Sequence, residues 1–80
     1  MSNEDRLKAA FVAALDIDPA ATAWENLTYR GIPEWDSIAH MRLIAEVEDT
    51  FDLMLETDDV INMSSYSAAK EIVAKNGVEV

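Results

Sequence analysis

The chain has 80 residues, 50% of them hydrophobic, with two glycines, two prolines and no cysteine. It is long enough for one small domain, too apolar for a disordered tail and too poor in turn residues for a many-stranded sheet, so we expect an all-α fold. Sixteen acidic and six basic residues give a net charge of −10, which disfavours nucleic acid and anionic membrane surfaces as partners.

The first predicted helix begins at Ser2, which has capping-box spacing to Asp5. Pro19 disfavours the helical conformation at the residue before it, so this helix should end between residues 15 and 17. Between these limits, apolar residues recur every three or four positions, as one face of a helix requires: Leu7, Ala10, Phe11, Ala14 and Leu15.

We expect neither a membrane span nor a signal peptide in this sequence. Its longest uninterrupted apolar run, residues 9–15, is too short to cross a bilayer, and the first residues lack the basic-then-apolar order of a signal peptide. We therefore expect a cytoplasmic monomer that does not bind membranes. Met1 and the capped start favour a complete small protein.

Residues 16–35 show no sustained period, and we expect a long loop there that packs against the core at several points. Thr22 and Glu25 again have capping-box spacing, which predicts one helical turn at residues 24–27. Trp35 should pack over the start of the next helix as a hydrophobic anchor; the alternative is a surface role in contact with a partner. The large apolar residues of the loop are Trp24, Leu27, Tyr29, Ile32 and Trp35.

The second helix should begin at Asp36 or Ser37 and end near residue 51, because apolar residues are again spaced three or four apart. Its expected inward face consists of Ile38, Met41, Leu43, Ile44, Val47 and Phe51. The opposite face should carry Arg42, Glu46 and Asp49.

Two shorter helices are predicted in the last third of the chain. The third should be capped by Thr57 and should bury Val60, Ile61 and Met63. The fourth should be capped by Ser64 or Ser65 and end at residues 76–77, with Lys70 and Lys75 near its negative end. Its expected inward residues are Tyr66, Ala69, Ile72 and Val73.

Together these elements predict one domain, residues 1–80, that forms a small four-helix bundle. It should have three main helices, a short third helix and a long loop between the first two helices. Met41, Met54 and Met63 are expected near the seam between the second helix and the later ones, where flexible side chains would let a short acyl group enter or would simply fill the core.

Ser37 stands at the start of the second predicted helix. If Asp36 is the cap, the Ser37 hydroxyl is free and points outward, where unpaired amides and the helix dipole favour an anion such as phosphate. His40 shares a helical face with Ser37, but a nucleophilic serine also needs an oxyanion hole, and no G-x-S-x-G turn is present. We expect no catalytic residue and, with one histidine and no cysteine, no metal site.

The stretch from Asp36 to Met63 resembles the acyl and peptidyl carrier proteins, which have an Asp-Ser-Leu signature at the start of the second of four helices. Asp36, Ser37 and Ile38 stand where the signature stands. Further residues follow in the order of the family, namely Leu43, Val47, Glu48, Asp49 and Phe51. The spacing onward to Met63, Ser64 and Ser65 also matches, so the resemblance covers essentially the whole chain.

The resemblance implies that Ser37 carries 4′-phosphopantetheine and that Asp36 is the cap and signature residue. It implies a non-catalytic carrier that holds acyl or aminoacyl groups as thioesters on this arm. Its partners would be a phosphopantetheinyl transferase and the enzymes that load and elongate the cargo. Ile38 replaces the usual leucine with another branched apolar residue. Ala39 and Arg42 stand where carriers of primary fatty acid synthesis often have acidic residues, and this difference favours polyketide, peptide or specialised fatty acid assembly.

Acidic residues dominate the stretch after Ser37, where Arg42 is the single basic residue up to Asp59. This tract is either a solvated face that keeps the protein soluble or a docking surface for basic partner surfaces. We favour docking because the tract adjoins Ser37. The predicted docking residues are Ile38, Met41, Arg42, Glu46, Glu48 and Asp49.

An alternative function is an acidic helical adaptor that binds a basic partner protein without modification, with Ser37 serving only as a helix cap. A calcium-binding loop beginning at Asp16 is excluded, because its sixth and twelfth positions are Ala21 and Leu27 instead of Gly and Glu.

Overall fold

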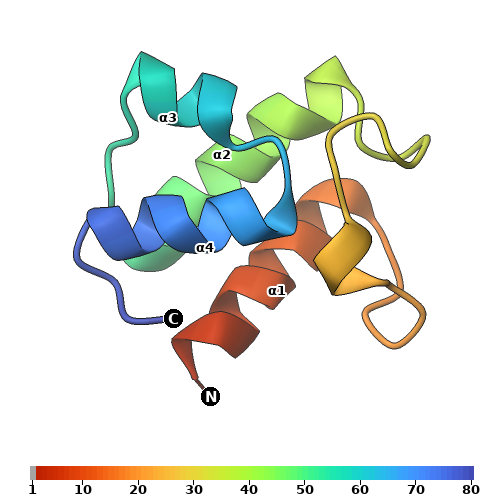
Figure 1. The fold of residues 1–80 in the computed structure, drawn as a ribbon, viewed down its shortest axis with the longest axis horizontal. Coiled ribbons are helices and arrows are strands. Elements are labelled where there is room, and N and C mark those ends of the chain that lie inside the picture. The colour runs from red at the N-terminus through yellow and green to blue at the C-terminus, as the bar shows by residue number, and fades with distance from the viewer. Residues whose placement is uncertain (1) are drawn as a thin grey trace.

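The helices follow one another as the sequence predicts. The computed structural model describes residues 2–80 and contains α1 (Asn3–Leu15), the 3-10 turn η1 (Trp24–Asn26), α2 (Ser37–Phe51), α3 (Thr57–Asn62) and α4 (Tyr66–Lys75) (Figure 1). Within residues 2–80 there is no strand, only an isolated antiparallel bridge between Thr28 and Ser65. The predicted small helical bundle with three main helices and a short one is confirmed.

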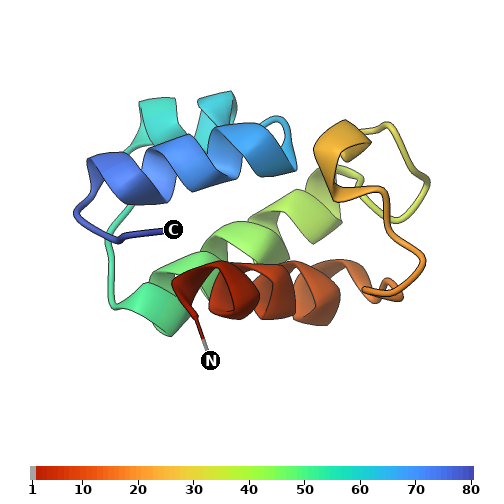
Figure 2. The same ribbon diagram turned by 60° about the horizontal axis from the view of Figure 1, so that its bottom comes forward.

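The bundle has two layers. Figure 2 shows α1 and α2 side by side in one layer and α3 and α4 in the other, with η1 near the start of α4. Between the layers lie the fully buried side chains Leu7, Phe11, Trp35, Leu43, Val47, Met63 and Val73. Across the described residues 2–80, none of the helices has both the length and the apolar character that a bilayer crossing demands.

Helix α1 forms as its sequence predicts. The Ser2 hydroxyl accepts a hydrogen bond from the Asp5 amide at 3.1 Å, and the buried residues of α1 are the five predicted ones. The helix ends at Asp16, which takes the left-handed conformation with φ 55° while its N–H donates to the Val12 carbonyl. A non-glycine residue in this region is uncommon, although aspartate tolerates it better than most.

Helix α2 has the predicted bounds, and three of its predicted inward residues, Leu43, Ile44 and Val47, are buried. Ala39, Leu43, Ile44 and Val47 are its buried residues. Ile38 and Met41 are 69% and 62% exposed, so their predicted inward position is wrong. At 3.6 residues per turn, Ile38 and Met41 lie roughly opposite Leu43 and Val47, and α1 and the second layer cover only the latter side.

The long loop is held in place by hydrogen bonds near its start and in its middle. η1 confirms the predicted turn, but Thr22 does not cap it, because the Thr22 hydroxyl donates to the Asp18 carbonyl at 2.6 Å instead. Further along, the Tyr29 amide donates to the Ser64 carbonyl at 2.8 Å and the Tyr66 amide to the Leu27 carbonyl at 3.0 Å. These backbone bonds fasten residues 27–29 beside the start of α4.

Helix α3 differs from the prediction in detail. Glu56 precedes the helix without a side-chain cap bond, so the predicted Thr57 cap is wrong. Ile61 is 68% exposed instead of buried, whereas Met63 is buried and Val60 is partly buried. The core instead covers Asp59, whose carboxylate pairs with the Lys75 ammonium of α4. A helix of six residues can bury only a narrow side, and Asp59 is the residue of α3 that lies fully on that side.

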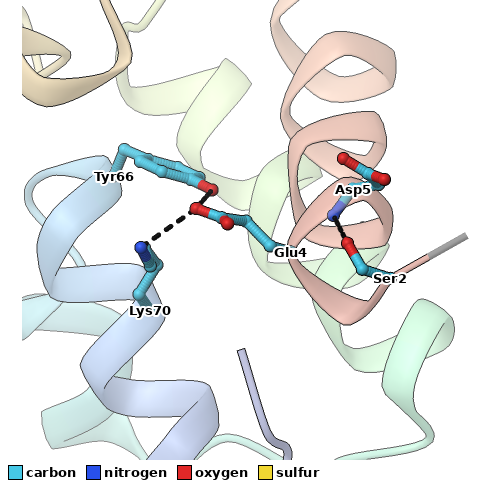
Figure 3. A network of polar contacts seen from close by, with 5 residues as sticks. All are labelled: Ser2, Glu4, Asp5, Tyr66 and Lys70. Atoms are coloured by element: carbon cyan, nitrogen blue, oxygen red, sulfur yellow. Dashed lines mark hydrogen bonds and ion pairs between the residues drawn. The ribbon is translucent and has the colours of Figure 1, made fainter.

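Helix α4 is confirmed, with Ser65 as its cap and the four predicted residues buried. Figure 3 shows how it is tied to α1: the Tyr66 hydroxyl donates to a Glu4 carboxylate oxygen at 3.3 Å, and the Lys70 ammonium lies 3.0 Å from the same oxygen. The hydrogen bond from Lys70 lowers the pKa of Glu4, and burial raises the pKa of Tyr66. Lys70 thus acts between helices, not at the end of its own.

Candidate functional site

Ser37 is the first residue of α2, and the residue before it caps the helix. Asp36 has an extended backbone, and its Oδ1 accepts a hydrogen bond from the Ala39 amide at 2.9 Å. Because Asp36 takes the cap position, the Ser37 side chain is not needed for capping. Ser37 is exposed beside the positive end of the helix dipole.

The sequence predicts a free Ser37 hydroxyl. In the structure this hydroxyl instead lies in a polar cluster with residues of the long loop. Its oxygen is 3.0 Å from the Tyr29 hydroxyl and 3.4 Å from Nη2 of Arg30. Nε of Arg30 in turn donates to the Tyr29 hydroxyl at 3.3 Å. The hydrogen bond with Ser37 and, next, the Arg30 guanidinium lower the pKa of the Tyr29 phenol. Sequence reasoning missed both residues.

The rings of Trp35 and His40 lie next to the Tyr29 ring of this cluster, at centroid distances of 6.3 Å and 5.2 Å. Trp35 is fully buried, as its predicted anchor role requires, and its Nε1–H donates to His40 Nδ1 at 3.0 Å. The other ring nitrogen, Nε2, lies 2.9 Å from the Val60 carbonyl and is therefore the protonated one. Both imidazole nitrogens are occupied, so His40 joins α2 to α3 and is not placed to act as a base for Ser37.

The exposed side of α2 begins one residue after Ser37. Ile38 and Met41 are large apolar side chains in solvent, and Arg42 and Asp49 are exposed beside them. The 3.6-residue period puts these four predicted docking residues on one side of the helix. An apolar strip with charged neighbours therefore adjoins the serine.

The remaining two predicted docking residues have other surroundings. Oε2 of Glu48 accepts a hydrogen bond from the Leu55 amide at 2.8 Å, which fixes the loop after α2. Glu46 is half-buried and borders a hollow on the α1 side of the helix, together with Arg6 and Thr50. The structure therefore separates these two glutamates from the exposed apolar strip.

Two apolar residues that the sequence analysis placed in the interior are also exposed. Met54, in the loop after α2, is 89% exposed, and Ile61 on α3 is 68% exposed. Only Met63 of the three methionines expected along the seam is buried, so a methionine-lined seam is not formed. An apolar residue on a short helix or loop cannot be placed inside or outside from its type alone.

No family model, curated protein or solved structure matches the chain. The candidate site is therefore defined by its own side chains. It consists of an exposed hydroxyl at a helix start, two hydrogen-bonding neighbours from the long loop, and an exposed apolar strip on the same helix.

Proposed function

We propose that the chain is a carrier protein that holds acyl or aminoacyl intermediates as thioesters on a 4′-phosphopantetheine arm at Ser37. The observation that carries this proposal is the position of Ser37, an exposed serine at the start of α2 whose hydroxyl is released from capping by Asp36. The resemblance of the Asp36–Ile38 stretch to the carrier signature supports the same role.

The residues around Ser37 suit a phosphodiester. Coenzyme A would be the donor: a bond would form between Ser37 Oγ and the phosphorus of the phosphopantetheine, the phosphoanhydride bond would break to release adenosine 3′,5′-bisphosphate, and the serine proton would pass to a base of the transferase. The product carries a negative charge at the positive end of α2. The arm supplies the thiol that a chain without cysteine lacks.

The proposed carrier would be recognised through the exposed strip of α2. Ile38 and Met41 offer apolar contact area directly after the modified residue, and Asp49 adds negative charge to it. The net charge of −10 would attract basic surfaces of the transferase and of the loading and elongating enzymes. Polyketide, peptide or specialised fatty acid assembly is the proposed setting.

Intact mass measurement tests the proposal. After incubation with coenzyme A and a phosphopantetheinyl transferase, the wild-type chain should gain one phosphopantetheine, and Ser37→Ala should gain none. Ser67→Ala, which removes an exposed serine of α4, is the matched control and should be modified like the wild type. An unmodified wild-type chain, or a modified Ser37→Ala chain, contradicts the proposal; the first result would favour the unmodified acidic adaptor.

A further inference from the structure

The loop segment Tyr29–Arg30 reaches the Ser37 oxygen with two different hydrogen-bonding groups. The phenol lies 3.0 Å and the guanidinium 3.4 Å from Oγ, and the two are themselves joined at 3.3 Å. Each of the three groups therefore contacts the other two. Such a closed cluster fixes their relative positions better than a single surface contact does.

The backbone places this segment at some conformational cost. Arg30 adopts the left-handed region with φ 62°, which is rare for a long side chain and strained. The conformation is held by the Arg30 amide, which donates to the Trp35 carbonyl at 3.0 Å, and by the Gly31 amide, which donates to the Thr28 carbonyl at 2.9 Å. Tyr29 is fastened separately to Ser64. The loop thus holds an arginine where glycine would fit without strain.

Arg30 brings a positive charge to Ser37 in a chain that is strongly acidic overall, and the Asp36 carboxylate lies nearby. In a protein of net charge −10, the serine hydroxyl is contacted by a guanidinium, the side chain best suited to bind phosphate oxygens. The phenol adds a second donor, since a tyrosine hydroxyl that faces an anion can donate its proton to it.

We propose that Tyr29 and Arg30 are positioning residues that bind the phosphodiester on Ser37 and hold the base of the arm against the loop. This inference rests on the proposed function. After modification, Oγ is an ester oxygen without a proton, the phosphorus is bonded to it, and the charged phosphate oxygens lie two bonds from Oγ. Arg30 and the Tyr29 hydroxyl then donate to those oxygens, and the arm leaves α2 on the loop side, away from Ile38 and Met41.

Phosphorus NMR of the modified protein tests the contact directly. In the wild type, the phosphodiester signal should be broadened by slow tumbling with the domain. In Tyr29→Phe and Arg30→Gln, the signal should shift and narrow, and Arg30→Lys should restore part of the wild-type line width because it keeps the charge. Lys8→Gln is the control: it removes one positive charge on α1, where the ammonium lies over the Trp24 ring. Its signal should match the wild type.

A second measurement follows Tyr29 itself through the ultraviolet absorbance of its phenolate. Modification replaces the Ser37 hydroxyl by an anion, so the pKa of Tyr29 should rise relative to the unmodified protein. Tyr66, the other tyrosine, is separated from it because burial already raises its pKa.

Mass measurement on the same samples distinguishes the two levels of failure. If the wild-type chain takes up no arm, the proposed function fails and this inference fails with it. If the chain is modified but Tyr29→Phe, Arg30→Gln and wild type share one phosphorus signal, only the positioning role is overturned. Circular dichroism of each variant confirms that the fold is retained, which the exposed position of Arg30 leads us to expect.

Discussion

Replacing His40 with alanine should destabilise the fold, because this side chain links the loop, α2 and α3. Its Nδ1 accepts the Trp35 indole N–H at 3.0 Å, and its Nε2–H donates to the Val60 carbonyl at 2.9 Å. Trp35 is fully buried. Once the imidazole is removed, the indole N–H has neither its acceptor nor ready access to water.

The expected loss of stability can be worked from these two bonds. A buried donor without an acceptor costs about 1–3 kcal/mol, and loss of the bond to Val60 adds about 0.5–1.5 kcal/mol. The sum of about 1.5–4.5 kcal/mol is large for a domain of this size. At roughly 0.05–0.15 kcal/mol per residue, 80 residues give about 4–12 kcal/mol of total stability.

Urea unfolding followed by tryptophan fluorescence measures this loss. Met41→Ala on the exposed side of α2 is the matched control and should change the free energy of unfolding by no more than about 0.5 kcal/mol. His40→Phe keeps a ring to stack on Trp35 but has no ring nitrogens, so it should lose most of the same stability. If His40→Ala and Met41→Ala unfold at the same urea concentration, the reasoning is refuted.

Three further predictions concern the ion pair between Asp59 of α3 and Lys75 of α4, the cap of α4, and the docking surface on α2. The hydrogen bond from Lys75 lowers the pKa of Asp59 in the folded state below its ordinary value of 3.8. The charged carboxylate therefore stabilises the fold above pH 3.8, and this stability is lost as the pH falls through the lowered pKa. Asp59→Asn should remove this acid-dependent part, and an unchanged profile of unfolding free energy against pH would exclude it. Ser65→Ala should cost about 0.5–2 kcal/mol by removing the α4 cap, whereas Thr57→Ala, which removes no cap bond, should cost clearly less in the same urea assay. Asp49→Lys should slow modification by the transferase and weaken its salt dependence, with Glu71→Lys on α4 as the control; equal rates for both variants would contradict a docking role for α2.

The sequence predicts the buried faces of α1 and α4 because both have a clear cap and one apolar stripe. Ser2 and Ser65 begin the two helices, and every residue predicted to be buried in them is buried. Helix α2 has apolar residues on more than one side, so its bounds could be predicted but its buried face only in part. The position of Ile38 becomes clear only when α1 and the second layer are seen to cover the side of Leu43.

The cluster around Ser37 could be predicted only in part. Asp36 and Ser37 follow from local helix chemistry, and the structure shows the predicted cap. The contribution of Tyr29 and Arg30 depends on a left-handed arginine and on backbone bonds to residues near Ser64, neither of which leaves a periodic signal in the sequence. Glycine would adopt this backbone conformation with less strain, so an arginine in the sequence does not predict it.

The backbone bonds between residues 27–29 and 64–66 join segments far apart in the sequence, and we expect them to form late in folding. Helices α1 and α2 pack against each other within the first part of the chain, whereas these two loop bonds require the start of α4. Closing a long loop is entropically costly and is deferred until the contacts that reward it exist. We therefore expect a refolding chain to form the start of α2, with Ser37, before Tyr29 and Arg30 are fastened beside it.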